Sequence, residues 1–133
     1  MNKYVLDACA VLALLKGEQG AEKVIKVIES DSEVILHSVT LLEIYYNLIK
    51  DIGVENANLF FENIVQTKIK IIYEVTENTI KNAGNYKSKY KISLGDSFVL
   101  ATAKMNNAII ITSDHHEFDV IENLEKINFM WFR

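Results

Sequence analysis

Four acidic residues stand where the chain could build a metal site: Asp7, Glu43, Asp96 and Asp114. Carboxylate oxygens are the ligands that hard divalent cations prefer, and Mg²⁺ in proteins usually keeps some waters and substrate phosphates beside a few carboxylates. The sequence has no cluster of Cys and His with the spacing of a zinc site. If the four carboxylates converge, we therefore expect them to hold Mg²⁺ or Mn²⁺ through oxygen ligands alone.

Each acid also has a simpler structural explanation. The segments Thr40-x-x-Glu43 and Ser93-x-x-Asp96 match the capping box, in which the acid bonds back to the first residue of the motif. The first acid would cap the helix that follows it, and the last would be a turn residue. Four carboxylates in one place repel one another, however, and no cap or turn requires that crowding. The complete set favours a cation site, while capping stays open for each acid taken singly.

The hydrophobic pattern predicts the elements that position these acids. Residues 4–6 form a short apolar run of β-prone residues, whereas residues 8–15 are rich in Ala and Leu, so we expect a strand, then Asp7, then a helix. A run without polar alternation is typical of a strand that is buried on both faces. The same reasoning predicts strands at 34–36, 69–75, 108–111 and 128–132, and helices at 21–29, 40–50, 56–66, 76–91 and 93–105.

Alternating strands and helices predict an α/β fold with a central, mostly parallel sheet of about five strands, covered by helices on both faces. In such sheets, ligands bind at the carboxyl ends of the strands. All four acids follow a predicted strand or open a predicted helix, so we expect them at one edge of the sheet. The length of 133 residues fits a single domain, 1–133.

Composition excludes several classes of protein. Half of the residues are hydrophobic, which indicates a globular chain, and a single cysteine, Cys9, rules out an internal disulfide and fits a reducing compartment. Cys9 lies among Ala and Leu, so we expect a buried apolar side chain rather than a nucleophile. Asp7 interrupts the only stretch that resembles an export signal, and no run is long enough to span a membrane. We expect a cytoplasmic protein with no membrane contact.

Positive charge is concentrated in one stretch. The net charge of −4 argues against nucleic-acid binding by bulk positive charge, but residues 68–91 contain six lysines and two glutamates, a local charge of +4 that leaves −8 on the rest. Its last lysines, together with two neighbouring tyrosines, could bind phosphates and stack on bases. A solvated helix whose lysines suit its dipole explains them equally well. The residues concerned are Lys87, Lys89, Lys91, Tyr86 and Tyr90.

The ordered set of acids resembles that of PIN-domain nucleases, close to the VapC-type toxins of prokaryotic toxin–antitoxin pairs. The matching segments, one around each acid, are residues 5–14, 41–48, 93–103 and 109–118. The resemblance implies a PIN-like three-layer α/β/α fold in which Asp7, Glu43, Asp96 and Asp114 are the catalytic and metal-binding residues. It implies an endoribonuclease that cuts RNA phosphodiester bonds with a water activated by Mg²⁺ or Mn²⁺. It also implies a homodimer, inhibited by a small cognate antitoxin in a type II pair.

The first motif departs from the PIN pattern. PIN domains commonly have Ser or Thr just after the first acid, where the hydroxyl supports the metal site, but this chain has Ala8 and Cys9. The alternative function is therefore a catalytically silent PIN scaffold that binds RNA or a protein. A haloacid-dehalogenase-like phosphatase would need a second Asp where Cys9 stands, so it is disfavoured.

The last motif is one residue longer than usual. Asp114 is the expected acid, but Glu117 or Asp119 could share its role. The adjacent pair His115-His116 would lie on a loop, and neighbouring loop residues rarely reach one ion. We expect these two histidines, and also His37, at the surface or supporting the ligands rather than binding the metal.

One helix carries more apolar residues than a single face can hold. Leu59, Phe60 and Phe61 are consecutive, so they cannot all face the same core. We expect Phe60 or Phe61 to point away from the sheet, where a second copy of the chain or an antitoxin would cover it.

Overall fold

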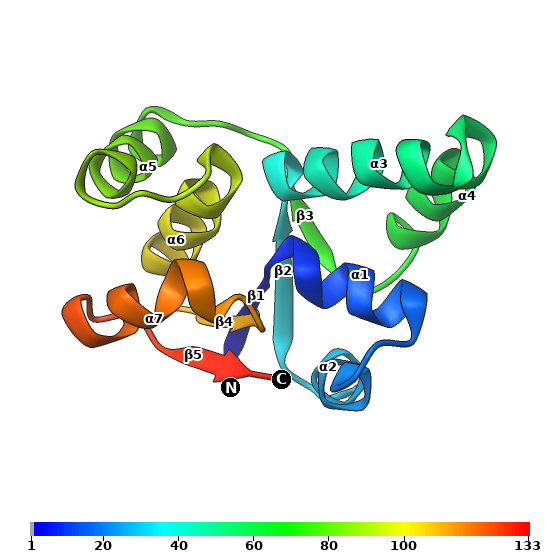
Figure 1. Ribbon diagram of the computed structural model, residues 1–133, viewed down its shortest axis with the longest axis horizontal. Helices are drawn as coiled ribbons and strands as arrows, with labels where there is room; N and C mark the ends of the chain where they lie inside the picture. Colours follow the sequence, from blue (N-terminus) through cyan, green and yellow to red (C-terminus); the bar gives the residue numbers. More distant parts are fainter. Residues whose placement is uncertain (1) are drawn as a thin grey trace.

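The computed structural model describes residues 2–133, in which five strands form one sheet in the order β3-β2-β1-β4-β5 (Figure 1). Every neighbouring pair of strands is parallel, so the predicted fold class is confirmed, with a sheet that is parallel throughout. No helix in this range is long and apolar enough to cross a bilayer. The strands are β1 (Lys3–Leu6), β2 (Glu33–His37), β3 (Lys70–Ile72), β4 (Ile109–Thr112) and β5 (Phe129–Trp131). The helices are α1 (Ala8–Lys16), α2 (Ala21–Glu29), α3 (Ser38–Ile52), α4 (Val54–Ile64), α5 (Glu77–Lys89), α6 (Leu94–Asn106) and α7 (His115–Leu124).

Strand side chains alternate between two apolar cores, one on each face of the sheet. Leu6 and Ile111 pack with residues of α1, α2, α3 and α4, whereas Val5 and Ile110 pack with residues of α5, α6 and α7. Figure 1 shows these two groups of helices on opposite sides of the sheet. Because the strands are parallel, the residues that follow β1 and β4 lie at the same edge.

Two elements differ from the prediction. β3 covers only Lys70–Ile72 of the predicted strand 69–75, and it is an edge strand that pairs with β2 alone. α7 occupies residues for which the sequence predicted a loop. Asp114 Oδ1 accepts a hydrogen bond from the Glu117 amide at 3.2 Å and so caps α7. Only Phe118 and Ile121 are buried in this helix, so its apolar periodicity is too short to be recognised.

The C-terminal residues pack against the turn between α1 and α2. Gly20 has φ +88°, and a Cβ there would overlap the backbone carbonyl of Phe132, so this close approach requires glycine. Arg133 donates from Nη1 to the Gln19 carbonyl at 3.3 Å and from Nη2 to Ser113 Oγ at 3.2 Å. The end of the chain thus joins the α1–α2 turn to the residues that follow β4.

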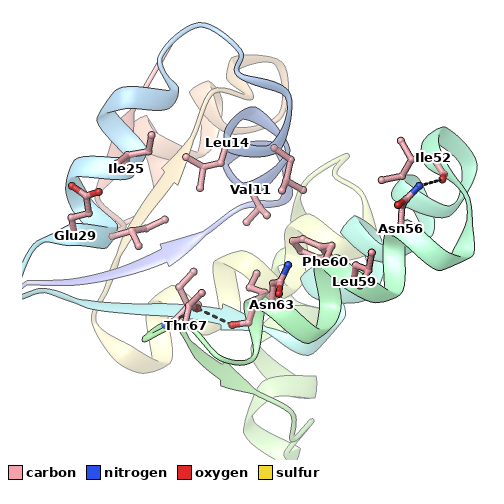
Figure 2. Close-up of a pocket in the computed structure, with 14 residues that line it drawn as sticks. Val11, Leu14, Ile25, Glu29, Ile52, Asn56, Leu59, Phe60, Asn63 and Thr67 are labelled. Carbon is pink, nitrogen blue, oxygen red and sulfur yellow. Dashed lines mark hydrogen bonds between the residues drawn. The ribbon is translucent and has the colours of Figure 1, made fainter.

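The three consecutive apolar residues of α4 have different surroundings. Phe61 packs edge-on against the Tyr45 ring, with centroids 5.9 Å apart. Phe60 lines an apolar groove bounded by α1, α2 and α4, and Leu59, 56% exposed, lies along it (Figure 2). The prediction that Phe60 or Phe61 points away from the sheet is wrong: both pack against the core on this face, and Leu59 is the exposed residue.

Candidate metal centre

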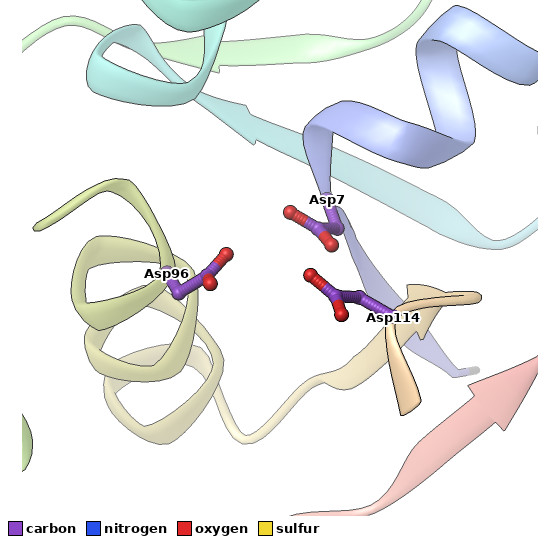
Figure 3. A group of neighbouring side chains, drawn as sticks. All are labelled: Asp7, Asp96 and Asp114. Atoms are coloured by element: carbon purple, nitrogen blue, oxygen red, sulfur yellow. The ribbon is translucent and has the colours of Figure 1, made fainter. Parts of the chain in front are cut away.

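Three of the four predicted acids converge at the carboxyl edge of the sheet. One carboxylate oxygen from each of Asp7, Asp96 and Asp114 lies within 4.8 Å of the others (Figure 3). Asp7 joins β1 to α1, Asp96 lies in the first turn of α6, and Asp114 joins β4 to α7. The paired parallel strands β1 and β4 end at this edge, and the start of α6, which follows α5 rather than a strand, brings the third aspartate to the same point.

Hydrogen bonds on both oxygens fix the Asp7 carboxylate. Oδ1 accepts from the Ala8 amide at 2.8 Å. Asp7 therefore caps α1, as predicted, and also belongs to the acidic cluster. Oδ2 accepts from Thr112 Oγ1 at 2.8 Å and from Cys9 Sγ at 3.2 Å. Burial raises the pKa of Asp7, and these three hydrogen bonds act against that increase.

Thr112, which the sequence analysis did not single out, ties two of the acids together. Its side chain is fully buried at the end of β4, donates to Asp7 Oδ2 and accepts from the Asp114 amide at 3.0 Å. A hydroxyl from the end of another strand therefore supports Asp7, although Ala8 and Cys9 follow it in the first motif. Its position two residues before Asp114 was the available sequence signal.

Asp96 is the most strongly perturbed acid of the cluster. It is 6% exposed, and burial, followed by the charge of Asp7, raises its pKa to about 8. Ser93 opposes this increase and caps α6 by accepting from the Asp96 amide at 3.1 Å. Without a cation, Asp96 therefore holds a proton at neutral pH.

Glu43 stands apart from the three aspartates. Burial, and then the charges of Asp7 and Asp114, raises its pKa. The predicted capping box at Thr40 is wrong, because α3 begins earlier and His37 caps it. A Cβ on Gly95 would overlap Glu43 Oε1, so glycine lets this carboxylate approach the start of α6. Glu43 thus lies beside the cluster, between α3 and α6.

The histidines are not part of the cluster. His37 was expected at the surface or in support of the ligands, and its burial excludes the surface position. Its Nδ1 accepts from the Val39 amide at 3.0 Å, and its Nε2 lies 3.2 Å from the Glu74 carbonyl. The other two lie at the start of α7, so their expected loop position is wrong as well. His115 contacts Asp119 and the Arg133 carbonyl, and both contacts raise the pKa of its imidazole.

Neither alternative to Asp114 lies within the three-acid group. Asp119 faces His115 through a contact of 2.8 Å, and Glu117 lies in the first turn of α7. Asp114 is thus the acid of this motif that the geometry brings to Asp7 and Asp96.

The donor set fits a hard divalent cation. The three converging groups offer only oxygen, and within residues 2–133 no Lys or Arg forms an ion pair with any of the three aspartates or with Glu43. Buried carboxylates with no opposite charge are costly unless they are protonated or bind a cation. The site therefore suits an ion such as Mg²⁺ or Mn²⁺.

The raised pKa of Asp96 predicts how the stability of the metal-free protein depends on pH. The folded state keeps the proton up to about pH 8, whereas an unfolded Asp releases it near 3.8. The stabilisation is complete below pH 3.8 and is lost as the pH rises through 8, so the free energy of unfolding falls over this range. With a chelator present, Asp96→Asn should raise the melting temperature more at pH 8 than at pH 5.

A distant exposed acid gives the matched control. Asp31→Asn, in the turn between α2 and β2, should leave the pH dependence of melting unchanged. An Asp96→Asn effect that is the same at both pH values would mean that the folded protein does not hold this proton.

Comparison with known proteins gives a consistent picture. The PIN domain model matches residues 4–124. Among solved structures, the chain is similar to VapBC-1 from nontypeable Haemophilus influenzae, with 17% identity, a TM-score of 0.74 and 98% of each chain covered. It is also similar to DNA-bound VapBC from Salmonella typhimurium, with 16% identity, a TM-score of 0.75 and 100% of each chain covered.

A third structure is described as a toxin that cleaves the sarcin–ricin loop, VapC20 from Mycobacterium tuberculosis. It is 15% identical, with a TM-score of 0.66, and the alignment covers 80% of this chain and 86% of that one. Comparison with curated protein sequences gives no match. These structural similarities, all at low identity, concern the fold, while the family model spans nearly the whole chain. The chain belongs to the PIN domain family.

Proposed function

We propose that the protein is a divalent-metal-dependent endoribonuclease of the VapC type, the toxin of a prokaryotic type II toxin–antitoxin pair. The observation that carries the proposal is the convergence of Asp7, Asp96 and Asp114, three buried or half-buried carboxylates with no cationic partner among residues 2–133. Membership of the PIN domain family supports it. The similar fold of a toxin that cleaves the sarcin–ricin loop makes RNA the substrate class we propose.

The three aspartates would hold the cation, and each has a defined support. Asp7 is held by Thr112, Cys9 and the Ala8 amide, and Asp96 would give up its proton when the cation binds. A bound Mg²⁺ or Mn²⁺ would lower the pKa of a water and stabilise the charge that grows on the phosphate during in-line attack.

Other groups at the site would orient the reactants. Glu43, beside the aspartates, would accept a hydrogen bond from the attacking water and align it. Asp7 and Asp114 cap α1 and α7, and Asp96 lies in the first turn of α6. The positive ends of these three helix dipoles therefore favour an RNA phosphate near the acids. No side chain needs to act as the nucleophile. Burial raises the pKa of Cys9 to about 12, which keeps it a thiol.

The alternative of a silent scaffold depended on the hydroxyl missing from the first motif. Thr112 donates a hydrogen bond to Asp7 and so provides an equivalent support. We therefore favour the nuclease.

Substitutions at the acids test this function. Asp7→Asn and Asp96→Asn should each lower Mg²⁺- or Mn²⁺-dependent cleavage of single-stranded RNA about 10²-fold or more, since each removes charge that the transition state needs. Thr112→Val should lower it about 10- to 100-fold, and Thr112→Ser should keep it, because the hydroxyl acts by holding a ligand. Cleavage rates with added metal and with chelator measure both effects.

The exposed Asp31→Asn serves again as control and should keep full activity. Full activity in both Asp7→Asn and Asp96→Asn would refute the site. Equal loss in Thr112→Val and Thr112→Ser would refute the hydroxyl's role.

The apolar groove along α4 is the surface that we propose for the antitoxin. Its volume is about 670 Å³, and its lining comes from α1, α2, α4 and the residues before β3. Figure 2 shows Val11, Leu14, Ile25 and Phe60 among the side chains around it. An apolar segment of a small protein would bury this surface, and several similar structures are complexes of toxin and antitoxin.

A charge in the groove tests the antitoxin surface. Leu59→Glu should abolish co-purification with the product of the neighbouring reading frame while RNA cleavage stays intact, because Leu59 is 56% exposed and lines a groove that contains none of the four acids. Val120→Glu is the matched control, since it is 59% exposed on α7 and does not line the groove. Unchanged co-purification of Leu59→Glu would place the antitoxin elsewhere.

Lys87 and Lys89 at the end of α5, together with Lys91 just after it, are the part of the surface that we propose to guide RNA. Lys87 and Lys91 are exposed and form no ion pair within residues 2–133, whereas Lys89 lies 3.9 Å from Glu125. Of the two tyrosines that could stack on bases, Tyr86 is only 3% exposed and is excluded. Tyr90 is partly exposed, and its hydroxyl donates to Glu125 Oε2 at 2.6 Å. Guidance by this stretch would depend mainly on phosphate contacts.

We also propose a homodimer. Exposed apolar side chains surround a hollow beside Glu43, and a second copy would cover them. They are Leu42, Tyr46 and Leu94.

Light scattering of the purified protein should give twice the chain mass, and Tyr46→Glu should lower the measured mass to that of the monomer. A monomer at high concentration would exclude the dimer.

A further inference from the structure

A column of aromatic rings extends outward from the core along β5 and the start of α7. The Phe129 ring packs against buried Phe118 at 5.4 Å, and Trp131 stacks on Phe129 at 5.4 Å with 12° between the rings. The His115 ring stacks on Trp131 at 3.9 Å and 13°. His115 is the residue directly after Asp114, so the backbone that carries the outer ring adjoins one of the three aspartates.

Hydrogen bonds hold the outer rings in place. His115 Nδ1 lies 2.8 Å from Asp119 Oδ1, and its Nε2 lies 2.9 Å from the Arg133 carbonyl. Trp131 Nε1 donates to Glu122 Oε2 at 2.9 Å. Trp131 is the only ring that stacks on His115 within residues 2–133, and the His115 side chain is 49% exposed. The His115 ring is thus held in place, and about half of its side chain remains accessible to a planar ligand.

A ring on which a base can stack would add affinity for RNA near this site. The carboxylates of the cluster repel phosphates when no cation is present, so charge alone gives little affinity there. Stacking of a base on an aromatic ring does not depend on the charge of the phosphate, and a preorganised ring costs little entropy on binding. Bases in a duplex are already stacked and paired, so such a surface selects unpaired RNA.

We propose that the column His115–Trp131–Phe129 is a platform on which an unpaired base of the substrate RNA stacks, beside the phosphate bound at the three aspartates. This inference rests on the proposed ribonuclease function and adds to it where the substrate binds and which form of RNA is selected. The platform binds the base, and it takes no part in the chemical step.

Binding in the presence of a chelator tests the platform without cleavage. The probe is a labelled oligoadenylate of roughly eight nucleotides, compared with an abasic oligonucleotide of the same length. His115→Ala should weaken binding of the oligoadenylate about 5- to 150-fold, the effect of losing one stacked base, and should not change binding of the abasic probe. The only tryptophan of the chain, Trp131, lies directly under the His115 ring, so its fluorescence should change with the oligoadenylate alone.

Two further variants separate stacking from other roles of His115. His115→Phe keeps a ring but loses the contacts with Asp119 and Arg133, so it should retain binding if the ring stacks on a base. His116→Ala, the exposed neighbour, is the matched control and should bind as the unchanged protein does. If His115→Phe is as weak as His115→Ala, the residue only anchors the C-terminus and the platform is refuted.

The outcomes also separate this inference from the proposed function. A protein that cleaves RNA with metal, and whose His115→Ala variant binds both probes normally, refutes the platform and leaves the ribonuclease intact. A protein that neither cleaves RNA with metal nor binds the oligoadenylate refutes both.

Discussion

Electrostatic repulsion among Asp7, Asp96 and Asp114 is the constraint around which this edge of the protein is arranged. No Lys or Arg forms an ion pair with them within residues 2–133, and burial adds to the cost of keeping them charged. Without metal, the protein reduces this cost by keeping a proton on Asp96, whose pKa burial and Asp7 raise to about 8. The same arrangement makes the site ready to exchange that proton for a cation.

Neutral dipoles, rather than charges, hold the acids in position. The Thr112 hydroxyl and the Ala8 amide bind Asp7, and Ser93 caps the turn that carries Asp96. Three helices start at the cluster, and their positive ends partly offset the negative charge. A cationic side chain in these places would compete with a metal ion, whereas dipoles stabilise the carboxylates and leave their remaining lone pairs free.

The sequence correctly indicated which acids lie at the carboxyl edge of the sheet, but it could not indicate how close together they lie there. The apolar run before Asp7 and the Ser93 cap before Asp96 are local signals, and both elements lie where they were expected. Glu43 satisfied the same reasoning, yet it stands beside the cluster, because the start of α3 at His37 sets its position. Thr112 lies two residues before Asp114, but its contact with Asp7, 105 residues away, could not be identified from that spacing.

The other differences between the predicted and the observed structure occur where the hydrophobic pattern of the sequence is short or mixed. The two buried residues of α7 make too short an apolar repeat to predict a helix, and the ring contacts join residues distant in sequence, so neither could be predicted from the sequence. The consecutive aromatics of α4 showed that one face could not hold them all, but packing against Tyr45 decided that Leu59 is the residue left exposed. Tertiary contacts, rather than local preference, determined these positions.

The central claim is that the three aspartates bind a divalent cation in exchange for a proton. Calorimetric titration with Mn²⁺ near pH 7, in two buffers that differ in ionisation enthalpy, measures both events at once. The unchanged protein should bind Mn²⁺ with release of about one proton, and Asp96→Asn should bind it more weakly and release none. Binding without proton release by the unchanged protein, or equal affinity in Asp96→Asn, would contradict it.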